Sequence, residues 1–196
     1  MVNDAPSPWN IANVVTMIRI VMVPFFAWAL LAEGGDSVTW RLIATALFVV
    51  AALSDKVDGY LARSRGLVTD LGKLLDPIAD KLLIGAALIL LWIPLGELPW
   101  WIPVVILVRE LGITFMRMGM LKYEVMPASR GGKLKTVLQS VAISLFLLPR
   151  EGLDWLTVIA WIVLMAAFVV TVVTGVEYVY QGWKIRQSAR AKASTT

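Results

Sequence analysis

The sequence predicts an all-α, polytopic membrane protein with six transmembrane helices and a polar cavity that opens to the cytoplasm. Three observations support this fold class. Of the 196 residues, 59% are hydrophobic and only 16% are charged, whereas soluble domains average about 45–50% and about 25%. The apolar residues gather in six blocks that charged connections separate. The positive charges concentrate in alternate connections, which is the pattern that orients membrane helices.

The six apolar blocks define the predicted helices in order. They are residues 20–32, 42–54, 82–96, 98–108, 136–149 and 155–176. Only the last block is longer than the roughly 18–20 residues that cross a hydrocarbon core unaided. The other five must therefore include charged residues at one end to complete a span.

A charged residue interrupts each of the five shorter blocks at the end expected on the cytoplasmic side. In helix order these residues are Arg19, Asp55, Lys81, Arg109 and Lys135. Block 98–108 covers about 16 Å, so Arg109 is predicted to lie well inside a core about 30 Å thick. A charge in hydrocarbon costs about 2.5–3.5 kcal/mol. We therefore expect these residues to line one shared polar cavity instead of facing lipid.

The basic residues predict that both chain termini are cytoplasmic. Lysine and arginine cluster in the second and fourth connections and in the tail, whereas the odd connections hold only Arg41 and Arg150 beside acidic residues. By the positive-inside rule, this pattern places the polar cavity on the cytoplasmic side. Residues 1–180 are predicted to form the membrane domain, and residues 181–196 a basic, disordered cytoplasmic tail on the anionic leaflet.

The sequence contains no cysteine and no histidine. This excludes disulfides, thiolate nucleophiles, Ser–His–Asp triads and zinc sites built on Cys and His. Any chemistry must use carboxylates, hydroxyls, lysine, arginine or a metal ion that oxygen ligands can hold.

Two pairs of aspartates mark a candidate metal site. Asp55 and Asp58 are three residues apart, and Asp76 and Asp80 are four apart, so each pair shares one helix face. Pro77 is expected near the start of the second of these helices, where its missing N–H is tolerated. Oxygen ligands favour Mg²⁺ or Mn²⁺, and two such ions can clamp a diphosphate. The alternative is a set of acidic caps and solvated loop charges paired with nearby basic residues.

The residues around the aspartates complete a longer pattern. It reads Asp55-x2-Asp58-Gly59-x2-Ala62-Arg63-x8-Gly72-x3-Asp76-x3-Asp80. This pattern resembles the signature of the CDP-alcohol phosphatidyltransferase family at all eight of its positions. Gly59 and Ala62 also leave the face of the first aspartate pair bare, so that a bulky group can lie against the helix backbone.

The resemblance implies a reaction and a role for each residue. The four aspartates would bind two divalent metal ions, Mg²⁺ or Mn²⁺, which hold the diphosphate of CDP-diacylglycerol. Asp80 would take the proton of the acceptor hydroxyl, which attacks the lipid-side phosphorus as CMP leaves. The residues implied in CDP-lipid binding are Gly59, Ala62, Arg63, Thr69 and Asn13. Helix capping is an equally good interpretation of Asn13 and of nearby Thr16.

A second, basic cluster is predicted to bind a phosphate group of the acceptor. Arg109 and Arg117 are eight residues apart, nearly in line along one helix, and Lys133 and Lys135 lie at the start of the next. The helix dipole favours an anion there, and arginine binds phosphate bidentately. The alternative is that these charges are topology signals that contact anionic lipid.

If the acceptor carries a phosphate, the sequence resembles one particular branch of the family. Arg109-Glu110 together with Gly132-Lys133-x-Lys135-Thr136 resembles the bacterial branch whose acceptor is sn-glycerol 3-phosphate. This implies a multi-pass protein of the bacterial inner membrane that forms a homodimer, contacts membrane lipid and binds no nucleic acid. A cardiolipin synthase of the same family is the closest alternative, and a transferase of the family with another acceptor, such as an inositol phosphate, is a further one. A transporter is a remote one, because it would be expected to show inverted repeats, and the sequence shows none.

Overall fold

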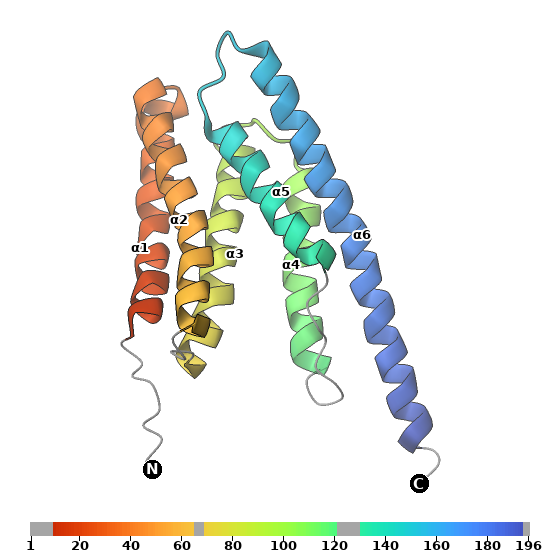
Figure 1. Cartoon of the computed structure of the whole chain (residues 1–196). Helices are drawn as coiled ribbons and strands as arrows, with labels where there is room; N and C mark the ends of the chain where they lie inside the picture. Colours follow the sequence, from red (N-terminus) through yellow and green to blue (C-terminus); the bar gives the residue numbers. More distant parts are fainter. Residues whose placement is uncertain (1–9, 65–68, 121–129, 194–196) are drawn as a thin grey trace. The chain divides into compact units, whose positions relative to one another are not determined.

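The computed structural model describes residues 10–64, 69–120 and 130–193, which form helices joined by short connections and contain no strand. The all-α prediction is therefore confirmed for this part of the chain. In order along the chain, the elements are α1 (Ile11–Leu31), η1 (Ala32–Gly35), α2 (Val38–Ser64), α3 (Asp70–Trp92), α4 (Trp101–Met120), α5 (Arg130–Leu147) and α6 (Asp154–Ala193). The helices α1 to α6 are labelled in Figure 1, and η1 is a single 3₁₀ turn.

Each of the six predicted apolar blocks falls mainly within a different helix, and the helices are longer than the blocks because they continue through charged residues. α2 runs past Asp55 to Ser64, and α4 runs past Arg109 to Met120. Among the described residues, the segments Asn13–Gly35 and Asp154–Gln187 are long and apolar enough to cross a membrane.

The structure corrects two local predictions. Pro77 lies in the interior of α3, because the helix begins at Asp70, where the Thr69 side chain caps it by accepting a hydrogen bond from the Gly72 N–H (3.1 Å). The tail predicted to be disordered from Gln181 continues α6 as far as Ala193. That stretch is rich in Ala, Lys, Arg and Gln and lacks proline, and these residues favour helix.

The described residues divide into two compact units. The first contains α1, η1, α2, α3 and the C-terminal end of α5. In this unit α1 packs against both α2 and α3, and the rings of Phe26 and Phe48 meet with centroids 5.7 Å apart in its core. The unit therefore brings the N-terminal helix against both helices that carry the aspartate pairs.

A cluster of ion pairs links three segments of the chain at one end of the first unit. Glu97 accepts hydrogen bonds from both Arg41 at the start of α2 and Arg150 after α5. Arg150 also donates to the Phe146 carbonyl (2.8 Å) and Arg41 to the Leu147 carbonyl (3.4 Å). These bonds satisfy carbonyl groups that the end of a helix leaves without a partner. The cluster thus joins α2, the connection after α3 and the end of α5.

The second unit contains α4, the beginning of α5 and most of α6. Trp101 and Phe168 meet edge to face, with ring centroids 5.2 Å apart, and Ile113, Met120 and Tyr178 form a small buried cluster. α4 and α6 approach closely at Gly175, where a Cβ atom would lie 3.1 Å from Cγ of Arg109. The small residue thus gives the long Arg109 side chain room between the helices.

Candidate active site

The polar side chains near the start of α1 point toward the other helices of the first unit. The cap of α1 is Asn10, whose side-chain oxygen accepts a hydrogen bond from the Asn13 N–H (3.0 Å). The side chains of Asn13 and Thr16 are therefore not caps, although the sequence allowed that interpretation. Both residues are almost fully buried, with 2% and 1% exposure.

Asn13 connects α1 to the start of α3. Its Nδ2 atom donates to Thr69 Oγ1 (2.8 Å), and the same oxygen accepts the capping bond from the Gly72 N–H. Gly72 is buried directly beneath this contact, and a Cβ atom there would lie 2.6 Å from Asn13 Oδ1. The glycine of the family signature thus has a local physical reason, which is the close approach of the Asn13 side chain.

Thr16 and Arg19 continue the same face of α1 toward the aspartate-bearing helices. Thr16 Oγ1 donates to Asp76 Oδ1 (2.8 Å), so a neutral hydroxyl orients this carboxylate. Arg19 is fully buried, and its Nε donates to Oγ of Ser54 (3.2 Å), the residue that precedes Asp55. The predicted role of Arg19 in a polar interior is consistent with this burial.

The two aspartate pairs lie on α2 and α3, which pack against each other. Asp55 and Asp58 are in the last turns of α2, and Asp76 and Asp80 are one turn apart in α3, so the predicted helical setting of both pairs is confirmed. The side chains of Asp55 and Asp58, like those of Gly59, Ala62 and Arg63, lie outside the described part of the structure. Metal binding by all four aspartates therefore stays a prediction. The described side chains alone contain no group of three or more possible metal ligands.

In the second unit, three of the four basic residues predicted to bind phosphate come together. Arg109 Nη1 donates to Glu110 Oε1 (3.0 Å), and Lys135 of α5 donates to the same oxygen. Arg117 Nη2 donates to the hydroxyl of Tyr178 (2.7 Å). The guanidinium groups of Arg109 and Arg117 lie 5.8 and 4.8 Å from the centroid of the Tyr178 ring. Both arginines of α4 thus contact the same tyrosine of α6.

Lys133 and Lys135 differ in burial. Lys133 is exposed, whereas Lys135 is buried at 5% exposure, because residues two apart on a helix do not share a face. The sequence placed both lysines in one site; the structure joins Lys135 to Arg109 through Glu110, and phosphate binding by Lys133 stays a prediction.

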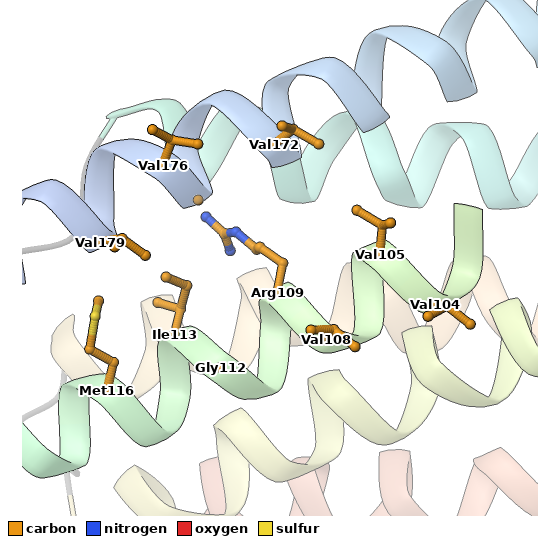
Figure 2. Close-up of a pocket in the computed structure, with 11 residues that line it drawn as sticks. Val104, Val105, Val108, Arg109, Gly112, Ile113, Met116, Val172, Val176 and Val179 are labelled. Carbon is orange, nitrogen blue, oxygen red and sulfur yellow. The ribbon is translucent and has the colours of Figure 1, made fainter. Parts of the chain in front are cut away.

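Arg109 also borders an apolar groove between α4 and α6. Figure 2 shows its side chain extending from α4 toward α6 among valines of both helices. The groove has a volume of about 630 Å³, and among the described residues that line it only Arg109 is charged. The Nε atoms of Arg109 and Arg117 are buried and have no hydrogen-bond partner within the described residues. The cluster thus retains donors that an anion can use.

The polar residues of α6 that form hydrogen bonds with α4 and α5 were not identified from the sequence. Thr174 Oγ1 accepts from Arg109 Nη2 (2.9 Å), and Thr171 Oγ1 accepts from Gln139 Nε2 of α5 (3.1 Å). With Tyr178, these residues follow the spacing i, i+3, i+7, which marks one face of a helix. That polar face within an otherwise apolar helix was the available signal.

Comparison with known proteins agrees with this arrangement. The sequence profile of the family described as CDP-alcohol phosphatidyltransferase matches residues 9–173. The chain belongs to the CDP-alcohol phosphatidyltransferase family. The matched segment includes α1 to α5 and ends at Val173 in α6, so it contains both groups of predicted site residues.

Relatives from several bacteria cover nearly the whole chain. A Mycobacterium tuberculosis protein named "Probable phosphatidylglycerophosphate synthase" is 50% identical over 92% of this chain and 87% of its own length. A Bacillus subtilis protein named "CDP-diacylglycerol--glycerol-3-phosphate 3-phosphatidyltransferase" is 38% identical over 90% of this chain and 96% of its own length. A Shigella flexneri protein of that same name is 33% identical, with coverages of 87% and 93%. The predicted enzyme class, a phosphatidyltransferase, is thus confirmed, and two helices of membrane-spanning length indicate a membrane protein.

Proposed function

We propose that this chain transfers a phosphatidyl group from CDP-diacylglycerol to sn-glycerol 3-phosphate, producing phosphatidylglycerophosphate and CMP. The observation that carries the proposal is identity of 50% and 38%, over about nine tenths of the chain, to relatives whose names state this product or this reaction. The basic cluster on α4 and α5 supports an acceptor that carries a phosphate monoester, because such a group has a charge of about −1.5 to −2, whereas the phosphodiester of phosphatidylglycerol has a single charge.

The proposed metal site uses the four aspartates of α2 and α3 and two ions of Mg²⁺ or Mn²⁺. The oxygen atoms of Asp76 and Asp80 are the ligands that these hard cations prefer. The bond from Thr16 orients the Asp76 carboxylate and leaves its charge intact, because the hydroxyl is neutral. When bound, the two ions would neutralise the diphosphate and the charge on the leaving group. Gly59, Ala62, Arg63, Thr69 and Asn13 are the proposed contacts of the CDP portion.

Asp80 is the proposed general base. Its carboxylate takes the proton of the acceptor hydroxyl, and the hydroxyl oxygen forms a bond to the lipid-side phosphorus. The bond between that phosphorus and the bridging diphosphate oxygen breaks, so that CMP leaves with the bridging oxygen. A carboxylate suits this role here because the chain has no histidine.

The acceptor phosphate is proposed to bind Arg109, Arg117 and Lys135, with Lys133 outside them. The buried Nε donors of both arginines lack hydrogen-bond partners in the described part of the chain, and hydrogen bonds between arginine and phosphate are strong because both groups are charged. Exposed Lys133 is placed to attract the acceptor over a distance without contacting it closely.

The proposed setting is the bacterial inner membrane, with six spans, both termini in the cytoplasm and the active-site cavity open to that side. Residues 1–180 form the membrane domain in this proposal, residues 181–196 are the basic cytoplasmic tail, and two copies form a homodimer. The distribution of lysine and arginine between alternate connections supports this orientation.

Release of CMP from CDP-diacylglycerol by the purified full-length chain tests the proposal. We expect release with Mg²⁺ and sn-glycerol 3-phosphate, and little with phosphatidylglycerol or with inositol 1-phosphate. Preference for phosphatidylglycerol would favour a cardiolipin synthase and overturn the proposed acceptor. No CMP release with any acceptor would overturn the proposed reaction, and a transport activity would then need testing.

A further inference from the structure

Glu110 is the acidic residue at the centre of the basic cluster of the second unit. Its Oε1 atom accepts hydrogen bonds from Arg109 Nη1 (3.0 Å) and from Lys135 Nζ. The side chains of Arg109, Glu110 and Lys135 are 12%, 18% and 6% exposed. One oxygen of one carboxylate thus links two largely buried cations that come from α4 and α5.

The described side chains of the cluster carry more positive than negative charge. Arg109 and Lys135 bind the Glu110 carboxylate, and Arg117 lies against the same tyrosine ring as Arg109. These four described side chains sum to a formal charge of +2. Like charges repel strongly where the effective dielectric constant is low, and Glu110 reduces this repulsion. A phosphate monoester carries a charge of about −1.5 to −2 at neutral pH, which matches the excess.

The Glu110 carboxylate also occupies donors that a phosphate would need. Arg109 Nη1 is bonded to Glu110 and Nη2 to Thr174, which leaves Nε without a partner in the described structure. Because the carboxylate holds one N–H group of Arg109 Nη1 and one of Lys135 Nζ, an anion that approaches these N–H groups competes with it. The two kinds of anion, carboxylate and phosphate, seek the same hydrogen-bond donors.

We propose that Glu110 is an internal counter-anion of the acceptor site. Its carboxylate holds Arg109 and Lys135 in place while the site is empty, and the acceptor phosphate displaces it from at least one of these cations. This inference rests on the proposed function, in which the acceptor carries a phosphate. That phosphate remains on the product, so a cluster without a competing carboxylate would also retain the product tightly.

The counter-anion role and a purely structural role predict changes of opposite sign. Glu110→Gln keeps the size of the side chain and removes its charge. If Glu110 competes with phosphate, the variant binds inorganic phosphate more tightly, by about tenfold for one charge-assisted hydrogen bond no longer in competition. If Glu110 only fastens α4 to α5, the cations lose their positions and phosphate binds more weakly.

The test measures binding of inorganic phosphate to the detergent-solubilised full-length chain, from the rise in melting temperature with phosphate concentration. Glu177→Gln is the matched control, because it removes the same charge from an exposed site of α6, and its dissociation constant should stay within about twofold of wild type. Inhibition of CMP release by inorganic phosphate, competitive with sn-glycerol 3-phosphate, should strengthen by the same factor in Glu110→Gln.

Glu110→Asp provides a second variant if Glu110→Gln does not fold. Its shorter side chain keeps the charge but cannot reach both cations, so we expect phosphate binding between that of wild type and that of Glu110→Gln. Unchanged or weaker phosphate binding in whichever variant folds would overturn the counter-anion role, as would a wild-type chain that binds no phosphate. The binding measurement needs no CDP-diacylglycerol, so failure of the proposed transfer reaction would be seen separately, as absence of CMP release.

Discussion

Substitution of Gly72 by alanine tests the contact between α1 and α3 that holds the aspartate-bearing helix. The new Cβ atom would lie 2.6 Å from Oδ1 of Asn13 and 3.3 Å from Oγ1 of Thr69. Overpacking of this kind costs about 1–3 kcal/mol, and loss of the Asn13–Thr69 hydrogen bond adds about 0.5–1.5 kcal/mol. The higher helix propensity of alanine returns at most about 1 kcal/mol. We therefore expect a net loss of roughly 0.5–4.5 kcal/mol.

The free energy of unfolding in detergent, measured in both the wild-type and the Asn13→Ala background, isolates this contact. Asn13→Ala removes the nearer of the two atoms that the new methyl group would meet, so Gly72→Ala should then cost at least about 1 kcal/mol less than in the wild-type background. Gly112→Ala on α4 is the matched control, because a Cβ atom there meets nothing within 4 Å. It should be neutral or stabilising by up to about 1 kcal/mol. An equal cost of Gly72→Ala in both backgrounds would refute the steric explanation.

Three further predictions concern catalysis. Activity should require Mg²⁺ or Mn²⁺ and disappear in excess chelator, and full turnover without a divalent ion would contradict the proposed metal site. Asp80→Asn should abolish CMP release yet retain part of the CDP-diacylglycerol binding, whereas Asp55→Ala should lose both; equilibrium binding beside the activity assay separates the two. Arg117→Ala and Lys135→Ala should raise KM for sn-glycerol 3-phosphate about 10- to 150-fold with little change in KM for CDP-diacylglycerol, and Lys133→Ala should raise it far less. Equal damage to both KM values would contradict the acceptor assignment.

The placement of each aspartate pair on one helix face could be predicted from the sequence, because it depends only on the spacing of the residues along the chain. Residues three or four apart share a face in any helix, so Asp76 and Asp80 could be paired before the position of α3 was known. The helix boundaries could not be predicted in the same way. The apolar block begins at Leu82, but the helix begins at Asp70 because the side chain of Thr69 caps it, and one hydrogen bond has no periodic signal.

Contacts between helices could not be predicted from the sequence either, because they depend on how each helix is rotated about its own axis. Lys133 and Lys135 looked equivalent in a basic stretch, and only the packing of α5 buries one and exposes the other. Glu110 could be noticed beside Arg109, but not its bond to Lys135, which lies 25 residues away along the chain. The charged composition of the site was thus predictable, whereas its pairing required the fold.

The two units orient their charged residues in different ways, and the difference fits what each is proposed to bind. Thr16 orients Asp76 with a neutral hydroxyl; a lysine or arginine in its place would neutralise the carboxylate and compete with a metal ion for it. Around Arg109 and Arg117, by contrast, Thr174 and Tyr178 supply neutral acceptors, and Glu110 supplies a single negative charge. Among the described side chains, one carboxylate does not neutralise three cations, and the excess of positive charge suits the proposed anion. A neutral donor thus leaves the negative charge of Asp76 for the proposed cations, and the incomplete neutralisation by Glu110 leaves positive charge for the proposed phosphate.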